Sequence, residues 1–201
     1  EQALFNNDLP VLRDEGQLVA SELGVTRQTE AFVLSPGPGT VIHYRGPLDN
    51  GDPASLSPSA ENHVMAALDA VLAGRAPARG RIAMPAAAPR IDLPTPPSIS
   101  YALDVAPIVQ RRCIACHSPG NIAPHSYTRF EDLASRANSI RASLLTRRMA
   151  PWHADAEYGA WSNDVALTPL ESATLHAWAK AGAPRGAGTD PIAAANTAAA
   201  T

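Results

Sequence analysis

The sequence has little charge and no long apolar run, and each of these two shortages excludes a class of protein. Charged residues make up 17% of the 201 residues, with a net charge of −3 and no basic stripe, so nucleic-acid binding is not expected. No apolar run approaches the roughly 20 residues that span a bilayer, so no membrane span is expected. The given sequence starts at Glu1 and contains no signal peptide, so a processed protein or a fragment is expected.

Cysteine is also scarce, and both cysteines fall in one motif, Cys113-Ile114-Ala115-Cys116-His117. Two thiols at this spacing can each add to a vinyl group of haem, and the adjacent imidazole can reach the iron from one face of the porphyrin. The motif therefore predicts one covalently attached haem c, bound through Cys113 and Cys116, with His117 as the proximal iron ligand.

Three other interpretations of the motif compete with haem attachment. A structural zinc site needs four ligands, usually from a second Cys/His pair, whereas the nearest other histidine is the single His125. A thioredoxin-type redox centre should lie between a buried strand and a helix, whereas residues 105–112 are predicted to form a short helix. A structural disulfide remains an alternative, although this separation is poor for joining two elements.

Compositional breaks divide the chain into four parts. Residues 85–99 form a Pro-rich stretch that is predicted to be an extended linker. Residues 188–201 are small and Ala-rich, and are predicted to form a flexible tail. The two remaining parts, 1–84 and 100–187, are each long enough to form a domain.

In residues 1–84, hydrophobic patterning predicts the order β-α-β-β-α. The expected elements are a strand at 9–12, a helix capped by Asp14 and ended by Gly24, strands at 31–34 and 40–45, and a helix over 62–74. Residues 9–25, 29–34, 44–49 and 62–74 resemble the second half of a thioredoxin-like (redoxin) domain. The half that carries the family's redox cysteines is absent, and Thr29 stands where the family has a cis-proline. The resemblance therefore implies a scaffold or docking module whose open sheet edge is covered by a partner or by chain further upstream.

Residues 100–187 are predicted to be all-α. The expected helices are at about 103–113, at 130–148, and after the capping box Thr168-Pro169-Leu170-Glu171. With the segments 149–155 and 161–164, this region resembles class I c-type cytochrome domains, which are often fused to redoxin domains and in some cases also to copper-dependent monooxygenase domains. The expected fold class is therefore α+β with two domains, a partial thioredoxin-like unit followed by a monohaem cytochrome c domain.

The cytochrome resemblance implies a distal iron ligand opposite His117. It points to Met149, which would follow the second helix and precede a proline. His153 is the main alternative and His125 a weaker one. His176, on the last helix, is expected to lie at the surface.

Residues around the haem are also implied. A ligating imidazole usually donates its other N–H to a carbonyl, and the resemblance makes Pro124 the candidate acceptor. Trp152 is either a donor to a haem propionate or a core aromatic. Arg148 either neutralises a propionate or is a solvated partner of the helix C-terminus.

The expected function is electron transfer by a single covalent haem, with redox partner proteins and other subunits of a larger complex. The protein would be an electron carrier rather than a catalyst on its own. Because haem is attached to this motif outside the cytoplasmic membrane, the resemblance implies a periplasmic or extracytoplasmic location. Two alternatives stay open: an electron-feeding fragment of a multidomain oxidoreductase, such as a copper-dependent monooxygenase fusion, and a peroxidase or small-ligand haem sensor.

Overall fold

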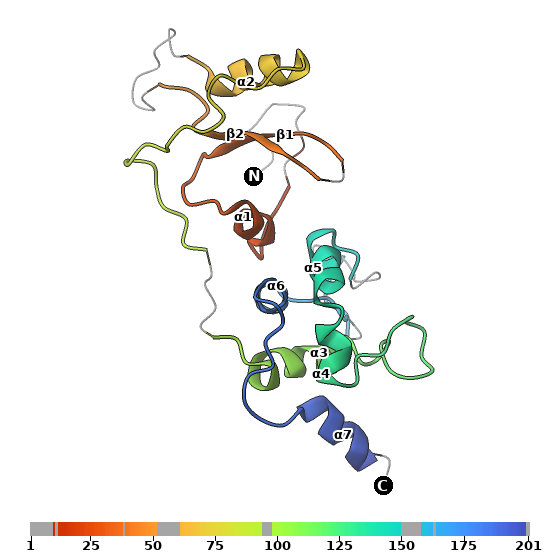
Figure 1. Cartoon of the computed structure of the whole chain (residues 1–201). Coiled ribbons are helices and arrows are strands. Elements are labelled where there is room, and N and C mark those ends of the chain that lie inside the picture. Colours follow the sequence, from red (N-terminus) through yellow and green to blue (C-terminus); the bar gives the residue numbers. More distant parts are fainter. Residues whose placement is uncertain are drawn as a thin grey trace. The chain divides into compact units, whose positions relative to one another are not determined.

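The protein has a mixed α+β structure (Figure 1). The computed structural model describes residues 10, 12–37, 39–51, 61–93, 98–149, 158–162 and 164–199. Contacts divide the chain into two units, one of residues 22–93 and one of residues up to 21 together with those from 94 onward. None of the helices in these described ranges has the length and hydropathy of a membrane span.

The smaller unit is built on a two-stranded antiparallel sheet. Strand β1 (Ala31–Leu34) pairs with β2 (Ile42–Gly46), with an irregularity in register between Val33 and Leu34. Helix α2 (His63–Leu72) packs on one face of the sheet, where Val33 and Tyr44 are buried against Ala67. Both predicted strands and the predicted helix are confirmed, although β2 begins two residues later than expected.

Helix α1 (Leu18–Leu23) crosses the division between the two units. The Asp14 carboxylate accepts hydrogen bonds from the backbone N–H groups of Leu18 and Ala20, both at 2.9 Å. Gly24 follows the helix at φ 61°, a conformation that glycine adopts without strain. The predicted cap and stop are thus confirmed. The strand predicted at 9–12 lies partly outside the described residues, and its two described positions are not in a strand.

The Pro-rich segment expected to be a linker, 85–99, is bound to the smaller unit over its first part. Two backbone hydrogen bonds join its residues to those at 26–28. The Arg27 guanidinium donates to the carbonyls of Ala86 and Ala88, at 3.0 and 2.6 Å. Backbone carbonyls outside helices and sheets need other hydrogen-bond partners, and Arg27 supplies one for these two. The segment is not extended throughout, because the Ala88 N–H donates to the Pro85 carbonyl at 3.0 Å in a turn, and it is packed rather than free up to residue 91.

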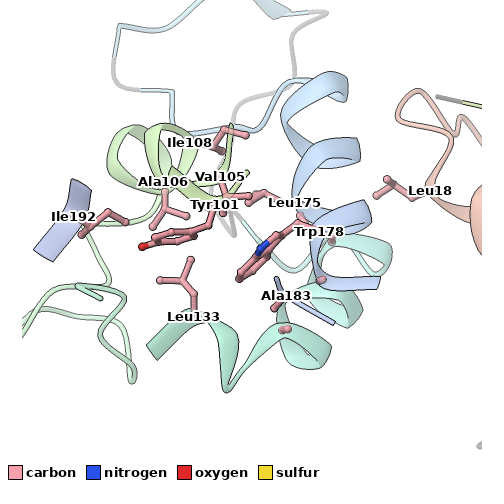
Figure 2. Close-up of a cluster of buried hydrophobic side chains, with 14 residues drawn as sticks. Leu18, Tyr101, Val105, Ala106, Ile108, Leu133, Leu175, Trp178, Ala183 and Ile192 are labelled. Atoms are coloured by element: carbon pink, nitrogen blue, oxygen red, sulfur yellow. The ribbon is translucent and has the colours of Figure 1, made fainter. Parts of the chain in front are cut away.

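The larger unit is helical apart from its loops. Its elements are a π-helical turn, η2 (Tyr101–Val105), and the helices α3 (Ala106–Arg112), α4 (Phe130–Ala134), α5 (Ala137–Leu145), α6 (Pro169–Lys180) and α7 (Pro191–Ala199). Tyr101 and Trp178 lie at the centre of the core, with Leu133 and Val105 around them (Figure 2). The Trp178 indole donates to the Pro184 carbonyl at 3.0 Å, so its polar group is satisfied inside the core.

The helix predicted over 130–148 is two helices, α4 and α5. The chain breaks at Ser135, whose hydroxyl donates to the Asp132 carbonyl at 3.0 Å, and at Arg136, which has φ −115° and ψ 11°. Serine side chains compete in this way with helix hydrogen bonds, which explains the break. Helix α5 then ends at Leu145, because Arg147 has a positive φ of 51°.

The flexible tail predicted over 188–201 contains a docked helix, α7. Its Ile192 side chain is buried in the core. Asp190 caps α7 through the Ile192 N–H at 3.0 Å, and it also accepts from the Tyr101 hydroxyl at 3.0 Å and the Phe130 N–H at 2.6 Å. The prediction of a flexible tail is therefore wrong for residues 190–199. The Asp190 carboxylate holds this helix to Tyr101 and Phe130, and amino-acid composition does not reveal such contacts.

Candidate functional site

The Cys113–His117 motif forms one tight turn directly after α3. The Cys113 N–H donates to the Val109 carbonyl at 2.9 Å and closes the helix. The N–H groups of Cys116 and His117 both donate to the Cys113 carbonyl, at 3.1 and 2.8 Å. Both thiols are free and partly buried, and the His117 side chain is buried. Two thiols and an imidazole are therefore presented from the same turn.

The His117 ring is held in one orientation and one tautomer. Its Nδ1 lies 2.7 Å from the backbone carbonyl of His125. A carbonyl only accepts, so Nδ1 carries the proton and Nε2 keeps its lone pair in the neutral ring. The Tyr127 ring stacks on the imidazole with centroids 4.3 Å apart and an interplanar angle of 16°. Such a ring is prepared to bind a metal through Nε2.

The acceptor carbonyl differs from the one expected, since it belongs to His125 and not to Pro124. Two backbone hydrogen bonds set the register of the loop, from Ala123 N–H to the Cys116 carbonyl at 3.1 Å and from Tyr127 N–H to the His117 carbonyl at 2.8 Å. These bonds decide which carbonyl faces the ring. The Pro124 prediction is therefore wrong by one residue, and local sequence contains no signal that would have corrected it.

The electrostatics of Cys113 disfavour thiolate chemistry. Burial, with smaller contributions from the negative charges of Glu171 and Cys116, raises the pKa of the Cys113 thiol to about 12. Cys113 also lies at the C-terminal end of α3, the negative end of the helix dipole. Redox cysteines of the thioredoxin type have lowered pKa values and lie at helix N-termini. Cys113 thus remains a neutral thiol at physiological pH.

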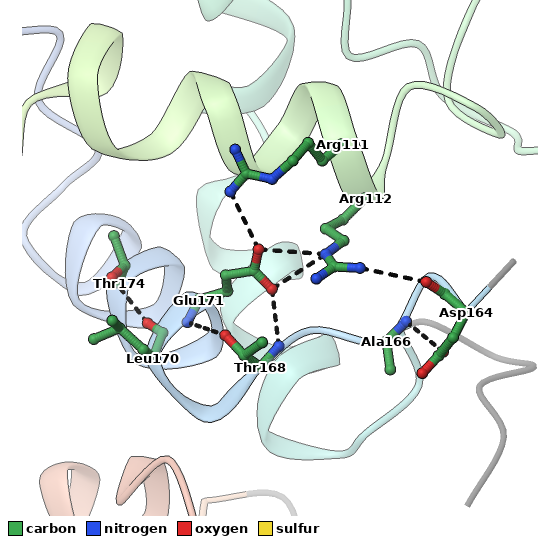
Figure 3. A network of polar contacts seen from close by, with 8 residues as sticks. All are labelled: Arg111, Arg112, Asp164, Ala166, Thr168, Leu170, Glu171 and Thr174. Carbon is green, nitrogen blue, oxygen red and sulfur yellow. Dashed lines mark hydrogen bonds and ion pairs between the residues drawn. The ribbon is translucent and has the colours of Figure 1, made fainter. Parts of the chain in front are cut away.

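A polar network joins the start of α6 to the end of α3 next to Cys113 (Figure 3). The predicted capping box is confirmed: Glu171 N–H donates to the Thr168 hydroxyl at 3.1 Å, and Thr168 N–H donates to the Glu171 carboxylate at 2.9 Å. The same carboxylate accepts from Arg112 Nε at 3.2 Å and from Arg111 at 3.3 Å. Sequence reasoning missed this link, for which Arg111-Arg112 directly before the motif was the available signal.

The structure does not test the predicted roles of the other site residues. Met149 lies four residues beyond the end of α5 and is 43% exposed, and the neighbouring Arg148 is also exposed. Trp152 and His153 lie outside the described residues. The distal ligand and the propionate contacts stay predictions.

His176 is buried, against the expectation of a surface position. Its side chain is only 2% exposed. Residues 16–21 cover that side of α6: Leu18 belongs to the same core, and Lys180 Nζ donates to the Ser21 carbonyl at 2.8 Å. The periodicity of α6 indicated one buried face, whereas the helix is covered on two sides.

No cluster of metal-binding side chains by itself forms a complete metal site in the described residues, the Cys113–His117 turn included. In the part of the chain that the structure describes, no group of three or more His, Cys, Asp or Glu residues could hold a metal ion. Comparisons with protein-family models, with curated proteins and with solved structures found no match to this chain. The chemistry of the Cys113–His117 turn is therefore the basis for a functional proposal.

Proposed function

We propose that the chain binds one c-type haem through Cys113 and Cys116, with His117 as an iron ligand, and that it transfers single electrons. The observation that supports this most is the His117 ring, whose Nδ1–H donates to the His125 carbonyl at 2.7 Å. Iron binds a neutral imidazole nitrogen, and the second ring N–H of a metal ligand is normally held by a carbonyl or carboxylate. The ring has both properties.

The two cysteines fit the same group. Both are free, and burial keeps Cys113 a neutral thiol. Each thiol would add across one vinyl group, forming a carbon–sulfur bond while its hydrogen passes to the other vinyl carbon. The turn places the two thiols next to His117, so attachment and ligation would use one short segment. When bound, the haem supplies a reversible one-electron couple.

Residues around the turn support a protected site. Stacking of Tyr127 on His117 restrains the imidazole and covers one of its faces. The hydrogen bonds of Glu171 with Arg111 and Arg112 join the start of α6 to the end of α3, directly before Cys113. They therefore restrain the helix from which the turn begins. We propose that this unit is a class I cytochrome c domain and that residues 22–93, with α1, are a redoxin-like docking module. Haem attachment outside the cytoplasmic membrane would place the protein there, with redox partners in a larger complex.

A mass measurement tests haem attachment. The full chain is co-expressed with a c-type haem attachment system and extracted with acid–acetone. The protein should keep the mass of one haem, and the double variant Cys113→Ala/Cys116→Ala should lose it. Free haem beside an unmodified polypeptide of the native sequence would contradict the proposal.

Iron ligation is tested with a matched histidine pair. His117→Ala should change the visible spectrum in both oxidation states. His125→Ala keeps the backbone carbonyl that orients His117, and its spectrum should match that of the native protein. An unchanged spectrum of His117→Ala would show that His117 does not ligate the iron, and a changed spectrum of His125→Ala would indicate that the His125 side chain is itself a ligand.

Carbon monoxide separates electron transfer from the ligand-binding alternative. An iron with a protein ligand on both faces resists carbon monoxide, whereas a peroxidase or sensor leaves one face open. The reduced protein should therefore keep its spectrum under carbon monoxide. Rapid stoichiometric binding would replace the electron-transfer proposal with that of a small-ligand haem protein.

A further inference from the structure

The smaller unit contains a pocket of about 530 Å³ that no step of the proposed haem chemistry uses. It lies between the loop that follows α1 and the segment at 80–84, which runs beside β2. Its polar lining includes Arg27, Arg45 and Arg81 against a single acidic residue, Glu30, so two positive charges are left uncompensated. Its apolar lining is Ile82, Ala83 and Met84.

Backbone geometry brings the arginines together from distant parts of the chain. Arg45 and Arg81 pair in a parallel bridge, and Arg45 N–H donates to the Gly80 carbonyl at 3.0 Å. The two segments approach closely at Gly46, where a Cβ would lie 2.7 Å from the Ile82 carbonyl oxygen. Glycine at this position therefore allows the pocket to form.

Among the described residues, Arg45 alone of the three arginines forms an ion pair with a carboxylate, although the charge of Arg81 also helps to lower the pKa of Glu30. Arg45 forms an ion pair with Glu30, and the two side chains are 17% and 4% exposed. Arg45 also donates to the carbonyls of Leu23 and Gly24, so its donors are engaged. This partly buried ion pair is part of the framework of the pocket.

Arg27 and Arg81 keep their charge available. The Arg27 guanidinium donates through Nη1 to two backbone carbonyls, which satisfies hydrogen bonds without neutralising charge. Within the described ranges, neither Arg27 nor Arg81 forms an ion pair with a carboxylate. A guanidinium offers five N–H donors in a planar fork that matches a carboxylate. Two such groups beside an apolar strip suit an anion that carries an apolar group.

We propose that this pocket binds a carboxylate attached to an apolar group, such as the C-terminus of a peptide ending in an aliphatic residue or a small organic acid. Arg81 and Arg27 hold the carboxylate, and Ile82 to Met84 contact the apolar part. The whole site lies within residues 24–84, so it does not rest on the proposed haem, and either proposal can fail without the other.

The probe for this site is N-acetylleucine, titrated into the full chain at low salt and followed by the backbone amide NMR signals of residues 81–84. We expect saturable binding in the millimolar range, and no binding of N-acetylleucinamide, which has the same apolar part without the charge. Equal binding of acid and amide, or no binding of either, would overturn the proposal.

Arginine variants locate the site. Arg81→Gln should weaken N-acetylleucine binding about tenfold, because a charge-assisted hydrogen bond is lost. Arg81→Lys should have an intermediate affinity, since an ammonium cannot form the bidentate contact. Arg75→Gln removes an equal charge from the same basic segment outside the pocket, and it should bind like the native chain. Equal weakening by Arg75→Gln and Arg81→Gln would show general attraction of anions and overturn the site.

Two peptides separate the possible sources of the carboxylate. A decapeptide ending in leucine with a free C-terminus is compared with N-acetylleucine, and its amidated form is the control. Binding of the free peptide at least tenfold tighter than N-acetylleucine indicates a protein terminus as ligand. Equal affinity indicates a small organic acid, and binding of the amidated peptide as tightly as the free one would overturn carboxylate recognition.

Discussion

The charge of Glu171 should stabilise the larger unit, and Glu171→Gln isolates that contribution. Glutamine has nearly the same shape and can keep the capping box with Thr168, but it cannot form ion pairs. The pair with Arg111, whose side chain is 58% exposed, is expected to contribute little. The pair with Arg112 is better shielded, with side-chain exposures of 26% and 12%. Hydrogen bonds to charged groups of this kind contribute about 1.5–3 kcal/mol.

The variant should therefore lose about 2 kcal/mol of unfolding free energy at pH 7, which lowers the melting temperature by roughly 4–8 °C in a domain of this size. All three tryptophans lie in the larger unit, so tryptophan fluorescence during urea unfolding reports on that unit alone. Thr168→Ala is the matched control: it removes the cap, at a cost of about 1 kcal/mol, and leaves the ion pairs in place.

The effect of Glu171→Gln should depend on pH. Burial by itself raises the pKa of Glu171, but the Thr168 N–H and the guanidiniums of Arg112 and Arg111 outweigh it, and the pKa lies below the ordinary value of 4.5. A carboxylate with a lowered folded-state pKa contributes stability above its unfolded pKa and loses it as pH falls through the folded value. The difference between native protein and variant should thus shrink below pH 4.5. An equal stability at pH 7, or a difference that stays constant down to acid pH, would refute this reasoning.

Four further outcomes are expected. Asp190→Asn should cost about 1–3 kcal/mol, since it weakens hydrogen bonds to a partly buried charge, and should remove hydrogen-exchange protection from α7; unchanged protection would contradict the docking of that helix. Gly46→Ala should destabilise the smaller unit, because its Cβ would meet the Ile82 carbonyl oxygen, and urea unfolding followed by hydrogen exchange would measure the loss. Met149→Leu should remove a weak far-red band of the ferric haem and lower its reduction potential. If Met149→Leu leaves the spectrum and the potential unchanged while His153→Ala shifts both, His153 is the distal ligand. The haem-loaded chain should show no insulin reduction above background, and clear turnover would mean that its cysteines are redox-active.

Elements with a strong local signal could be predicted from the sequence. The capping box at 168–171 determines where α6 begins, because both partners lie within four residues. The run at 31–34 forms a strand, and Gly74 follows the helix that it was expected to stop. The Cys113–His117 motif brings two thiols and an imidazole together in any fold that keeps the turn. In each case the interacting groups are neighbours in sequence.

Only the tertiary structure decided which distant groups meet. The carbonyl that orients His117 comes from His125, because backbone hydrogen bonds set the register of the intervening loop. Asp190 converts a low-complexity tail into a docked helix by contacts with Tyr101 and Phe130, which lie 89 and 60 residues away.

The same limit applies to burial and to the arginine pocket. The helix α6 is covered on two sides, so His176 is buried although periodicity places it away from the main inner face. Arg27, Arg45 and Arg81 form one pocket because the chain returns beside β2 at 80–82. Hydrophobic periodicity and helix capping depend on residues that are close in sequence. The contacts that bury His176 and bring the three arginines together depend instead on how whole segments pack, which is determined by residues throughout the chain.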